Sequence, residues 1–258
     1  MSEVLYEQRG AVALITLNRP QNLNGFNNAL RVAAQAAVAR AASDDSIRAV
    51  VLTGAGRGFS AGADLAAGES PTSASIVRIL EDEYGSTILQ LANMPKITIA
   101  AVNGFAAGIG VGFALACDLV VMGESGFFQV PFNRIGLVPD GGVCWQLVER
   151  LGHRRALEFA LEAERVPAPR CVELGLVNRV VPDDQVQTAA LEWAARIAAS
   201  APIAARLTKR VMREAANTTL AATIGLEARA QSHCIESEDF REGVLAFLTK
   251  RPAKFVGR

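Results

Sequence analysis

The sequence predicts an α/β core followed by a helical C-terminal region. Short apolar segments rich in β-branched residues alternate with helix-like segments in the first part of the chain. Beyond Pro182, four helix-like segments follow one another with no predicted strand between them. Half of the 258 residues are hydrophobic, which is enough for a sizeable core. We therefore expect a core over residues 1–200 and a helical region over residues 201–258.

The first predicted elements are two strands and a helix. Residues 5–9 and 12–17 are strand-like, and Gly10 supplies a tight turn between them. A helix is expected over residues 27–42, because its periodic pattern ends at an acidic pair. The chain therefore begins with two neighbouring strands and one covering helix.

The next segment contains a strand, a glycine-rich loop and a polar stretch. Residues 49–53 form a short apolar strand that leads into the glycine-rich loop 54–58. Residues 69–75 are polar and include Pro71, so we expect a mobile loop or lid there. A helix that ends near Asn93 should follow.

Residues 97–117 carry no charge and are long enough to cross a bilayer. However, residues 96–102 are rich in β-branched residues, and Asn103-Gly104 is a turn signal. A buried strand, a turn and a helix explain the segment better. No association with a membrane is therefore expected.

The remaining predicted elements complete the core and the helical region. Strands are expected at residues 119–122 and 177–181, and helices at 141–151 and 154–161. The four C-terminal helices are expected at residues 183–200, 203–216, 220–232 and 239–249.

Charge and composition argue against several classes of function. With 26 basic and 26 acidic residues, the chain lacks the net positive charge typical of proteins that bind nucleic acid or anionic membranes. Its two isolated histidines, His153 and His233, offer little to a metal site or a serine-type triad. The four cysteines form no CxxC pair, and the N-terminus does not resemble a secretory signal. We expect reduced thiols and a cytoplasmic protein.

Three glycine-containing segments carry the chemical signal, and each is expected near the end of a strand: residues 59–65, 101–112 and 132–142. A helix that begins at Gly108 would aim free N–H groups and its positive dipole end at a bound group. Residues 56–61 also match the GxGxxA spacing of a dinucleotide loop, but glycines and a proline interrupt the helix that such a loop needs. Plain turn glycines are the other alternative.

Four segments resemble the enoyl-CoA hydratase/isomerase, or crotonase, family. They are NRPQNLN (18–24), FSAGADL (59–65), AVNGFAAGIGVGFALACDL (101–119) and EGVLAFLTKRPAKFVGR (242–258). The resemblance extends over essentially the whole chain. It implies a crotonase-like spiral of ββα units with a helical C-terminal trimerisation region, and a homotrimer or a dimer of trimers. It also implies a coenzyme A thioester as substrate, with no metal and no further cofactor.

The same resemblance implies where the substrate binds. Two backbone amides of this family bind the thioester oxygen, and by motif position they belong to Ala63 and Ile109. Such preorganised donors stabilise the enolate that forms when a proton beside the thioester carbonyl is removed. The implied substrate and coenzyme A contacts are Leu23, Gly25, Ala61, Ala63, Asp64, Leu65, Ile109, Phe132 and Lys250. Lys250 would reach the adenine or phosphates of coenzyme A, in its own or a neighbouring subunit. The alternative is a solvated lysine. Phe127, Phe128 and Phe132 would line a dry acyl pocket.

The carboxylates decide the type of reaction. Hydratases of the family carry two glutamates at positions that Gly112 and Phe132 occupy here, and neither residue can exchange a proton. Asp140 matches the single acid of the family's double-bond isomerases. One carboxylate can take a proton from C2 and return it to C4. We therefore expect an isomerase that converts 3-enoyl-CoA to 2-enoyl-CoA, or that performs the related ring isomerisation in phenylacetate degradation.

Several alternatives remain open from the sequence. Asp140 could cap the helix that follows it, and Asp64 and Asp118 are expected to orient backbone by local hydrogen bonds. Residues 81–83 could include a second acid, although three successive acids are typical of a solvated face. The alternative functions are an enoyl-CoA hydratase or CoA-thioester hydrolase with an unrecognised acid, and a non-catalytic acyl-CoA-binding or scaffolding protein.

Overall fold

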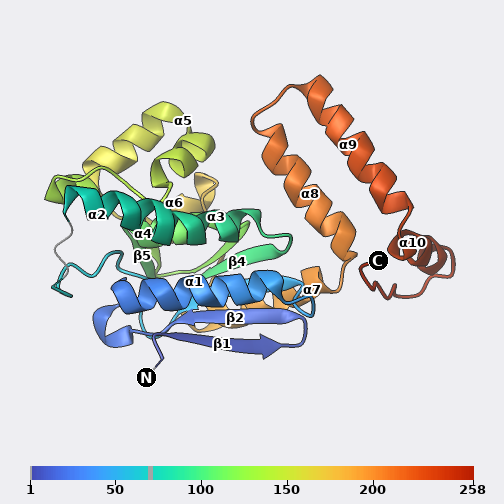
Figure 1. The fold of residues 1–258 in the computed structure, drawn as a ribbon, viewed down its shortest axis with the longest axis horizontal. Helices are drawn as coiled ribbons and strands as arrows, with labels where there is room; N and C mark the ends of the chain where they lie inside the picture. The colour runs from blue at the N-terminus through green and yellow to red at the C-terminus, as the bar shows by residue number, and fades with distance from the viewer. Residues whose placement is uncertain (1, 69–71) are drawn as a thin grey trace.

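The computed structural model describes residues 2–68 and 72–258 and contains a layered core beside a separate group of helices (Figure 1). The large sheet has the strand order β1-β2-β3-β4-β6-β9. β1 pairs with β2 antiparallel, and each later neighbour is parallel. The strands are β1 (Val4–Arg9), β2 (Val12–Leu17), β3 (Ala49–Gly54), β4 (Ile97–Val102), β6 (Leu119–Gly123) and β9 (Arg179–Val181). All six were predicted, although β9 begins two residues later than expected.

A second, small sheet was not predicted from the sequence. Its strands, in the order β5-β7-β8, are β5 (Phe105–Ala107), β7 (Phe127–Gln129) and β8 (Val166–Pro167). Each strand has only two or three residues, too few to show a period of two in the sequence. β5 was expected as part of the turn and helix after β4, and instead it pairs with β7.

Helices cover both faces of the large sheet. One face packs against α1 (Asn28–Ser43), α3 (Ser86–Asn93), α4 (Ile109–Ala116) and α5 (Val143–Glu162), and the other against α7 (Val186–Ala198). The alternation along β2 decides the face, because Ala13, Ile15 and Leu17 join the first core while Val12 and Leu14 join the second. A kink at Gly152 divides α5 near the boundary between the two predicted helices. The short helix α6 (Ala168–Glu173) was not predicted.

The predicted loop over residues 69–75 is only partly described. Residues 69–71 lie outside the described residues. Thr72 caps α2 (Ser73–Arg78) through a capping box with Ser75, so the expectation of a loop was wrong for residues 73–75. A π-helical stretch, Ile79–Gly85, joins α2 directly to α3.

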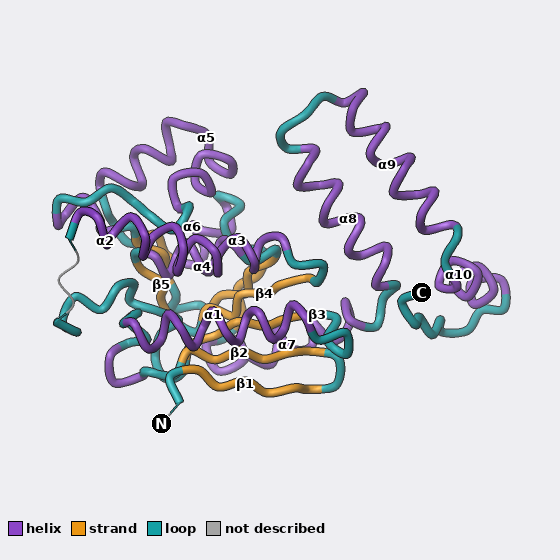
Figure 2. Tube along the Cα trace, in the orientation of Figure 1, coloured by secondary structure: helices purple, strands orange, loops and turns teal. Residues whose placement is uncertain are grey.

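Beyond β9 the structure describes helices only, as predicted. α8 (Pro202–Ala215) and α9 (Leu220–Ile235) form an arm beside the core, and α10 (Glu238–Leu248) lies near the C-terminus, at the end of the arm where α8 begins (Figures 1 and 2). No helix among the described residues is long and apolar enough to span a membrane. The division into residues 1–200 and 201–258 as separate domains stays a prediction.

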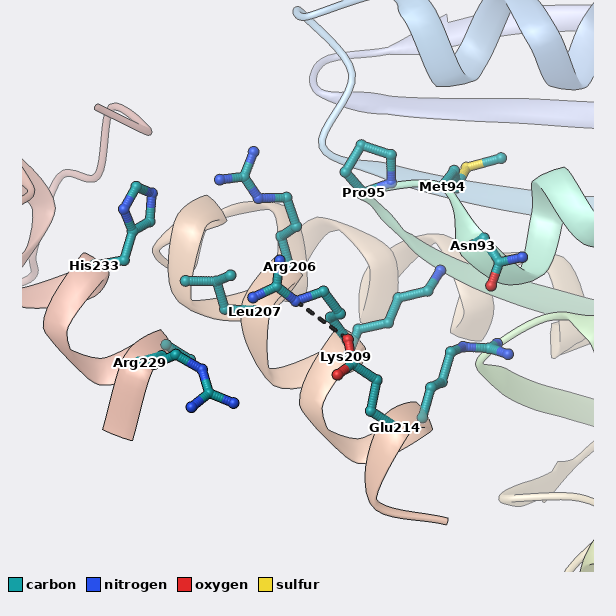
Figure 3. Close-up of a pocket in the computed structure, with 12 residues that line it drawn as sticks. Asn93, Met94, Pro95, Arg206, Leu207, Lys209, Glu214, Arg229 and His233 are labelled. Atoms are coloured by element: carbon teal, nitrogen blue, oxygen red, sulfur yellow. Dashed lines mark ion pairs between the residues drawn. The ribbon is translucent and has the colours of Figure 1, made fainter. Parts of the chain in front are cut away.

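The helical arm is anchored at the amino-terminal edge of the parallel strands. Lys209 of α8 donates to the carbonyl of Lys96, just before β4, at 2.9 Å, and forms an ion pair with Asp118 at 2.8 Å. Arg213 binds the second oxygen of Asp118 at 3.0 Å. A cleft of about 560 Å³ lies between this edge and the arm, and arginines such as Arg206 and Arg229 line it (Figure 3).

Candidate active site

Two glycine-containing segments meet at the carboxyl edge of the large sheet. β3 and β4 are parallel and in register, so the chain leaves both strands at the same edge. Ser60 forms a parallel bridge with Ala106, and the Ala107 N–H donates to the Ser60 carbonyl at 2.9 Å. A Cβ added to Gly62 would lie only 3.4 Å from the Cα of Gly108, so the two glycines lie against each other. Ala63 and Ile109 each follow one of these glycines by one residue.

The backbone of Ala63 is held by its neighbours in a way that leaves its own N–H free. Phe26 donates to the Gly62 carbonyl at 2.8 Å and accepts from the Asp64 N–H at 3.0 Å. In such a parallel bridge the intervening Ala63 N–H points to the opposite side. Ile109 is the first residue of α4, where an N–H has no partner within the helix. In the described part of the chain neither amide has a hydrogen-bond partner.

The start of α4 has features that favour an anion. Gly108 precedes the helix with φ 54° and ψ −130°, a conformation that suits glycine and disfavours residues with a Cβ. The N–H of Gly108 is already used by the Gln129 carbonyl at 3.0 Å, so the next amide, that of Ile109, remains available. The positive end of the helix dipole reinforces it. These two amides therefore have the arrangement expected of an oxyanion hole.

Asp140 lies in the turn that packs onto the first turn of α4. Its Oδ1 is buried and has no hydrogen-bond partner among the described residues. Burial raises the pKa of Asp140 to about 6, because desolvation penalises the charged carboxylate. The alternative of a helix cap was wrong, since Gly142 holds the N-cap position of α5 without any side-chain cap bond. The carboxyl is thus half-buried, and its Oδ1 has no partner in the described part of the chain.

The two predicted apolar replacements for acids also lie here. Gly112 is buried in α4 and faces the carbonyl of Gly141, while Phe132 is buried with its ring near Gly108. The predicted three-phenylalanine lining is only partly supported. Phe127 instead stacks on Phe105 at 5.5 Å between ring centroids, and Phe128 is fully buried in the core. No group of three or more potential metal ligands occurs among the residues described.

The other predicted contacts divide into near and distant residues. The Leu23 carbonyl accepts from the Ala61 N–H at 2.9 Å, and Gly25 packs against Asp64. Leu65 is 72% exposed. Lys250 follows α10, and the tail after it contacts Arg48 at the opposite, amino-terminal edge of the sheet. Within a single chain, Lys250 therefore lies away from this site.

Arg19 is a site residue that the sequence did not single out. Its guanidinium binds the carboxylate of Asp64 at 2.8 Å, and both side chains are about nine-tenths buried. It also donates to the Gly25 carbonyl, while its backbone N–H donates to the buried Asn24 side chain at 2.9 Å. Only the motif NRP-x-N-x-N hinted at this network, because Arg19 and Asp64 lie 45 residues apart in the sequence.

The remaining candidate acids either have structural partners or, as with Glu81 and Asp82, are exposed to solvent. Asp64 accepts from the Ala66 N–H and Asp118 from the Thr98 N–H, as predicted for carboxylates that orient backbone. Glu83 forms ion pairs with Arg31 at 2.8 Å and Arg78 at 2.9 Å. Among the candidate acids, Asp140 is the one whose carboxylate retains an unsatisfied buried oxygen.

Known proteins match this chain over its full length. The Enoyl-CoA hydratase/isomerase family model matches residues 7–258. A probable enoyl-CoA hydratase of Rhodobacter capsulatus is 40% identical, with 99% of this chain and 98% of the relative covered. The 1,2-epoxyphenylacetyl-CoA isomerase of Escherichia coli is 36% identical, with 100% of both chains covered. An enoyl-CoA hydratase structure from Bacillus anthracis has a TM-score of 0.95 at 30% identity and covers 99% of this chain and 100% of that one. The chain therefore belongs to the enoyl-CoA hydratase/isomerase (crotonase) family.

Proposed function

We propose that this protein is an enoyl-CoA isomerase that moves a carbon–carbon double bond through a thioester enolate. The observation that carries the proposal is the lone, half-buried carboxylate of Asp140, whose Oδ1 has no partner among the described residues and whose neighbour Gly141 packs against Ile109 at the start of α4. The substrate is an unsaturated acyl-CoA, and the reaction requires neither a metal nor a redox cofactor. We further propose a cytoplasmic homotrimer or dimer of trimers, in which Lys250 of a neighbouring subunit contacts coenzyme A.

The proposed reaction uses one proton and one base. The thioester oxygen of a 3-enoyl-CoA accepts hydrogen bonds from the amides of Ala63 and Ile109. Asp140 removes a proton from C2, and the electron pair delocalises over the dienolate, with its charge at the oxygen between the two donors. The now neutral Asp140 returns the proton to C4, which leaves the double bond between C2 and C3. No proton is gained or lost overall.

The raised pKa of Asp140 suits both halves of this reaction. At pH 7 to 8 a carboxyl with a pKa of about 6 is mostly ionised and ready to accept a proton. It is also a stronger base than an ordinary aspartate, and its protonated form is less costly in a poorly solvated position. The pH dependence of the rate should therefore show a rise through about pH 6 and a plateau above it.

Hydration is the second candidate, and the names of relatives such as the Rhodobacter capsulatus protein favour it. A hydratase must hold and deprotonate a water molecule and also protonate the α-carbon. Gly112 and Phe132 supply no acid for a second role, and Glu83 is engaged by two arginines. The Escherichia coli relative's name instead favours the ring isomerisation of a phenylacetyl-CoA derivative as a variant of the proposed chemistry.

Separate incubations with 3-enoyl-CoA and 2-enoyl-CoA test the proposal, with the conjugated-enoyl absorbance as readout. Isomerisation predicts rising absorbance with the first substrate, and that rise should vanish in Asp140→Asn. Asp184→Asn is the matched control, because Asp184 is an exposed carboxylate in the short 3-10 helix Asp183–Gln185 before α7. Falling absorbance with 2-enoyl-CoA would support hydration instead. Binding without turnover of either substrate would support a scaffolding role, and unchanged turnover in Asp140→Asn would refute the role of Asp140.

A further inference from the structure

Gly112 of α4 makes an unusually close contact with the turn that carries Asp140. A Cβ added to Gly112 would lie 2.7 Å from the backbone carbonyl oxygen of Gly141 and 3.3 Å from Cγ2 of Val143. Real side chains do not approach a backbone oxygen at 2.7 Å, so one of the two segments would have to move. The turn over residues 140–142 therefore rests directly on the helix backbone.

The contact is reciprocal, because Gly141 is also constrained. A Cβ on Gly141 would lie 2.7 Å from Cγ1 of Ile109, and Gly141 has φ 59°, which favours glycine. Gln146 fastens the same region, since its Nε2 donates to the Gly112 carbonyl at 3.1 Å and its backbone N–H donates to Gly142. Two glycines thus interlock the first turn of α4 with the turn before α5.

We propose that Gly112 is a positioning residue that fixes the single-acid arrangement of this site, an inference that rests on the proposed function. The missing side chain at position 112 allows the 140–142 turn to close onto α4 and bury the Asp140 carboxyl. A glutamate at position 112 would push this turn away. The buried position of Asp140 therefore depends on a glycine at position 112. An acid cannot be placed at position 112 while the Asp140 carboxyl stays where it is.

The degree of burial of Asp140 reports the position of the turn. When the turn is displaced from α4, water reaches the carboxyl and its pKa falls toward the ordinary value. This readout does not depend on turnover, because the pKa can be obtained from the pH dependence of unfolding. Each variant is compared with the same variant that also carries Asp140→Asn, so that only the titration of Asp140 remains in the difference.

The decisive comparison is Gly112→Ala against Gly225→Ala. Gly225 is a helical glycine of α9, where an added Cβ would meet only the flexible end of Arg229 at 3.4 Å. We expect Gly112→Ala to lower the pKa of Asp140 and to reduce kcat about tenfold with little change in KM, because the base is displaced but the thioester contacts remain. Gly225→Ala should change neither quantity. An unaltered Asp140 pKa and kcat in Gly112→Ala would overturn the proposal.

Two further variants keep the proposal testable if Gly112→Ala does not fold. Gly141→Ala displaces the turn from its other side, and adding Ile109→Ala removes the nearer of the two side chains, Ile109 and Ile88, that the new Cβ would meet. The double variant should recover part of the kcat and Asp140 pKa that the single variant loses, and no recovery would count against the interlock. Gly112→Glu should gain no hydratase activity, and hydration with an unchanged Asp140 pKa would refute the incompatibility. If the wild type lacks isomerase activity but the pKa shifts occur, the proposed function fails while the interlock stands.

Discussion

Replacing Asp140 by asparagine should abolish isomerase activity and at the same time stabilise the folded protein at pH 8. Asparagine has nearly the same shape but carries no charge, so the packing of the 140–142 turn is kept. The wild-type fold bears the cost of a partly desolvated carboxylate whose buried Oδ1 has no partner among the described residues. Removing that charge removes the cost and the base together.

The size of the effect follows from the shift in pKa. Burial raises the pKa of Asp140 from 3.8 to about 6, a difference of about two units. One unit corresponds to about 1.4 kcal/mol, which gives about 3 kcal/mol for a carboxyl wholly shielded from water. Asp140 is only half-buried, and solvent screening reduces the value to about 1–2 kcal/mol.

The raised pKa of Asp140 also determines how the free energy of unfolding changes with pH. Between pH 4 and 6 the folded state keeps a proton on Asp140 that the unfolded state has lost, so the wild-type free energy of unfolding decreases as pH rises through this window. Asp140→Asn lacks this decrease. The stability difference between the two proteins should therefore be small near pH 4 and reach its full 1–2 kcal/mol above about pH 7.

Urea unfolding at pH 4.5, 6 and 8, at one fixed protein concentration, measures this difference, and the conjugated-enoyl assay measures activity on the same samples. Asp184→Asn is the control for the general effect of removing a carboxylate. The reasoning would be refuted if Asp140→Asn were no more stable than the wild type at pH 8. It would also be refuted if the difference in free energy of unfolding between the two proteins did not grow with pH.

Three further changes test the rest of the site and its support. Asp64→Asn should lower the free energy of unfolding by about 2 kcal/mol in urea, because Arg19 loses a buried charge partner. The same variant should lower kcat more than it changes KM, and equal changes in kcat and KM would contradict a role in placing the oxyanion amides. Gly108→Ala should lower kcat at least about tenfold with the fold retained by circular dichroism, since φ 54° disfavours alanine; wild-type turnover would exclude this. Asp118→Ala should cost about 3–5 kcal/mol in urea unfolding, because Lys209 and Arg213 lose their shared carboxylate; a loss below 1 kcal/mol would show that the anchor of α8 is not energetically important.

The sequence alone determined much of the fold and part of the site. Five strands of the large sheet and the four C-terminal helices followed from periodicity and turn residues, because these elements are long enough to show their pattern. The three-residue strand β9 was found as part of the longer apolar segment 177–181. The assignment of the Ala63 and Ile109 amides came from the resemblance of the glycine-containing segments 59–65 and 101–119 to the family. Local backbone conformation at Gly62 and Gly108 is specified by neighbouring residues, so a motif can identify it.

The tertiary structure decided what the sequence left open. Spacing could not tell whether Asp140 caps a helix or remains an unpaired acid, and it did not reveal the small sheet, the Arg19–Asp64 pair or the contact between Gly112 and Gly141. Each of these depends on segments tens of residues apart. The pKa of a carboxyl is set by how much water and which partners those distant segments leave around it. The sequence therefore pointed to Asp140 as the candidate acid, and the packing of α4 against the 140–142 turn accompanies its burial and its raised pKa.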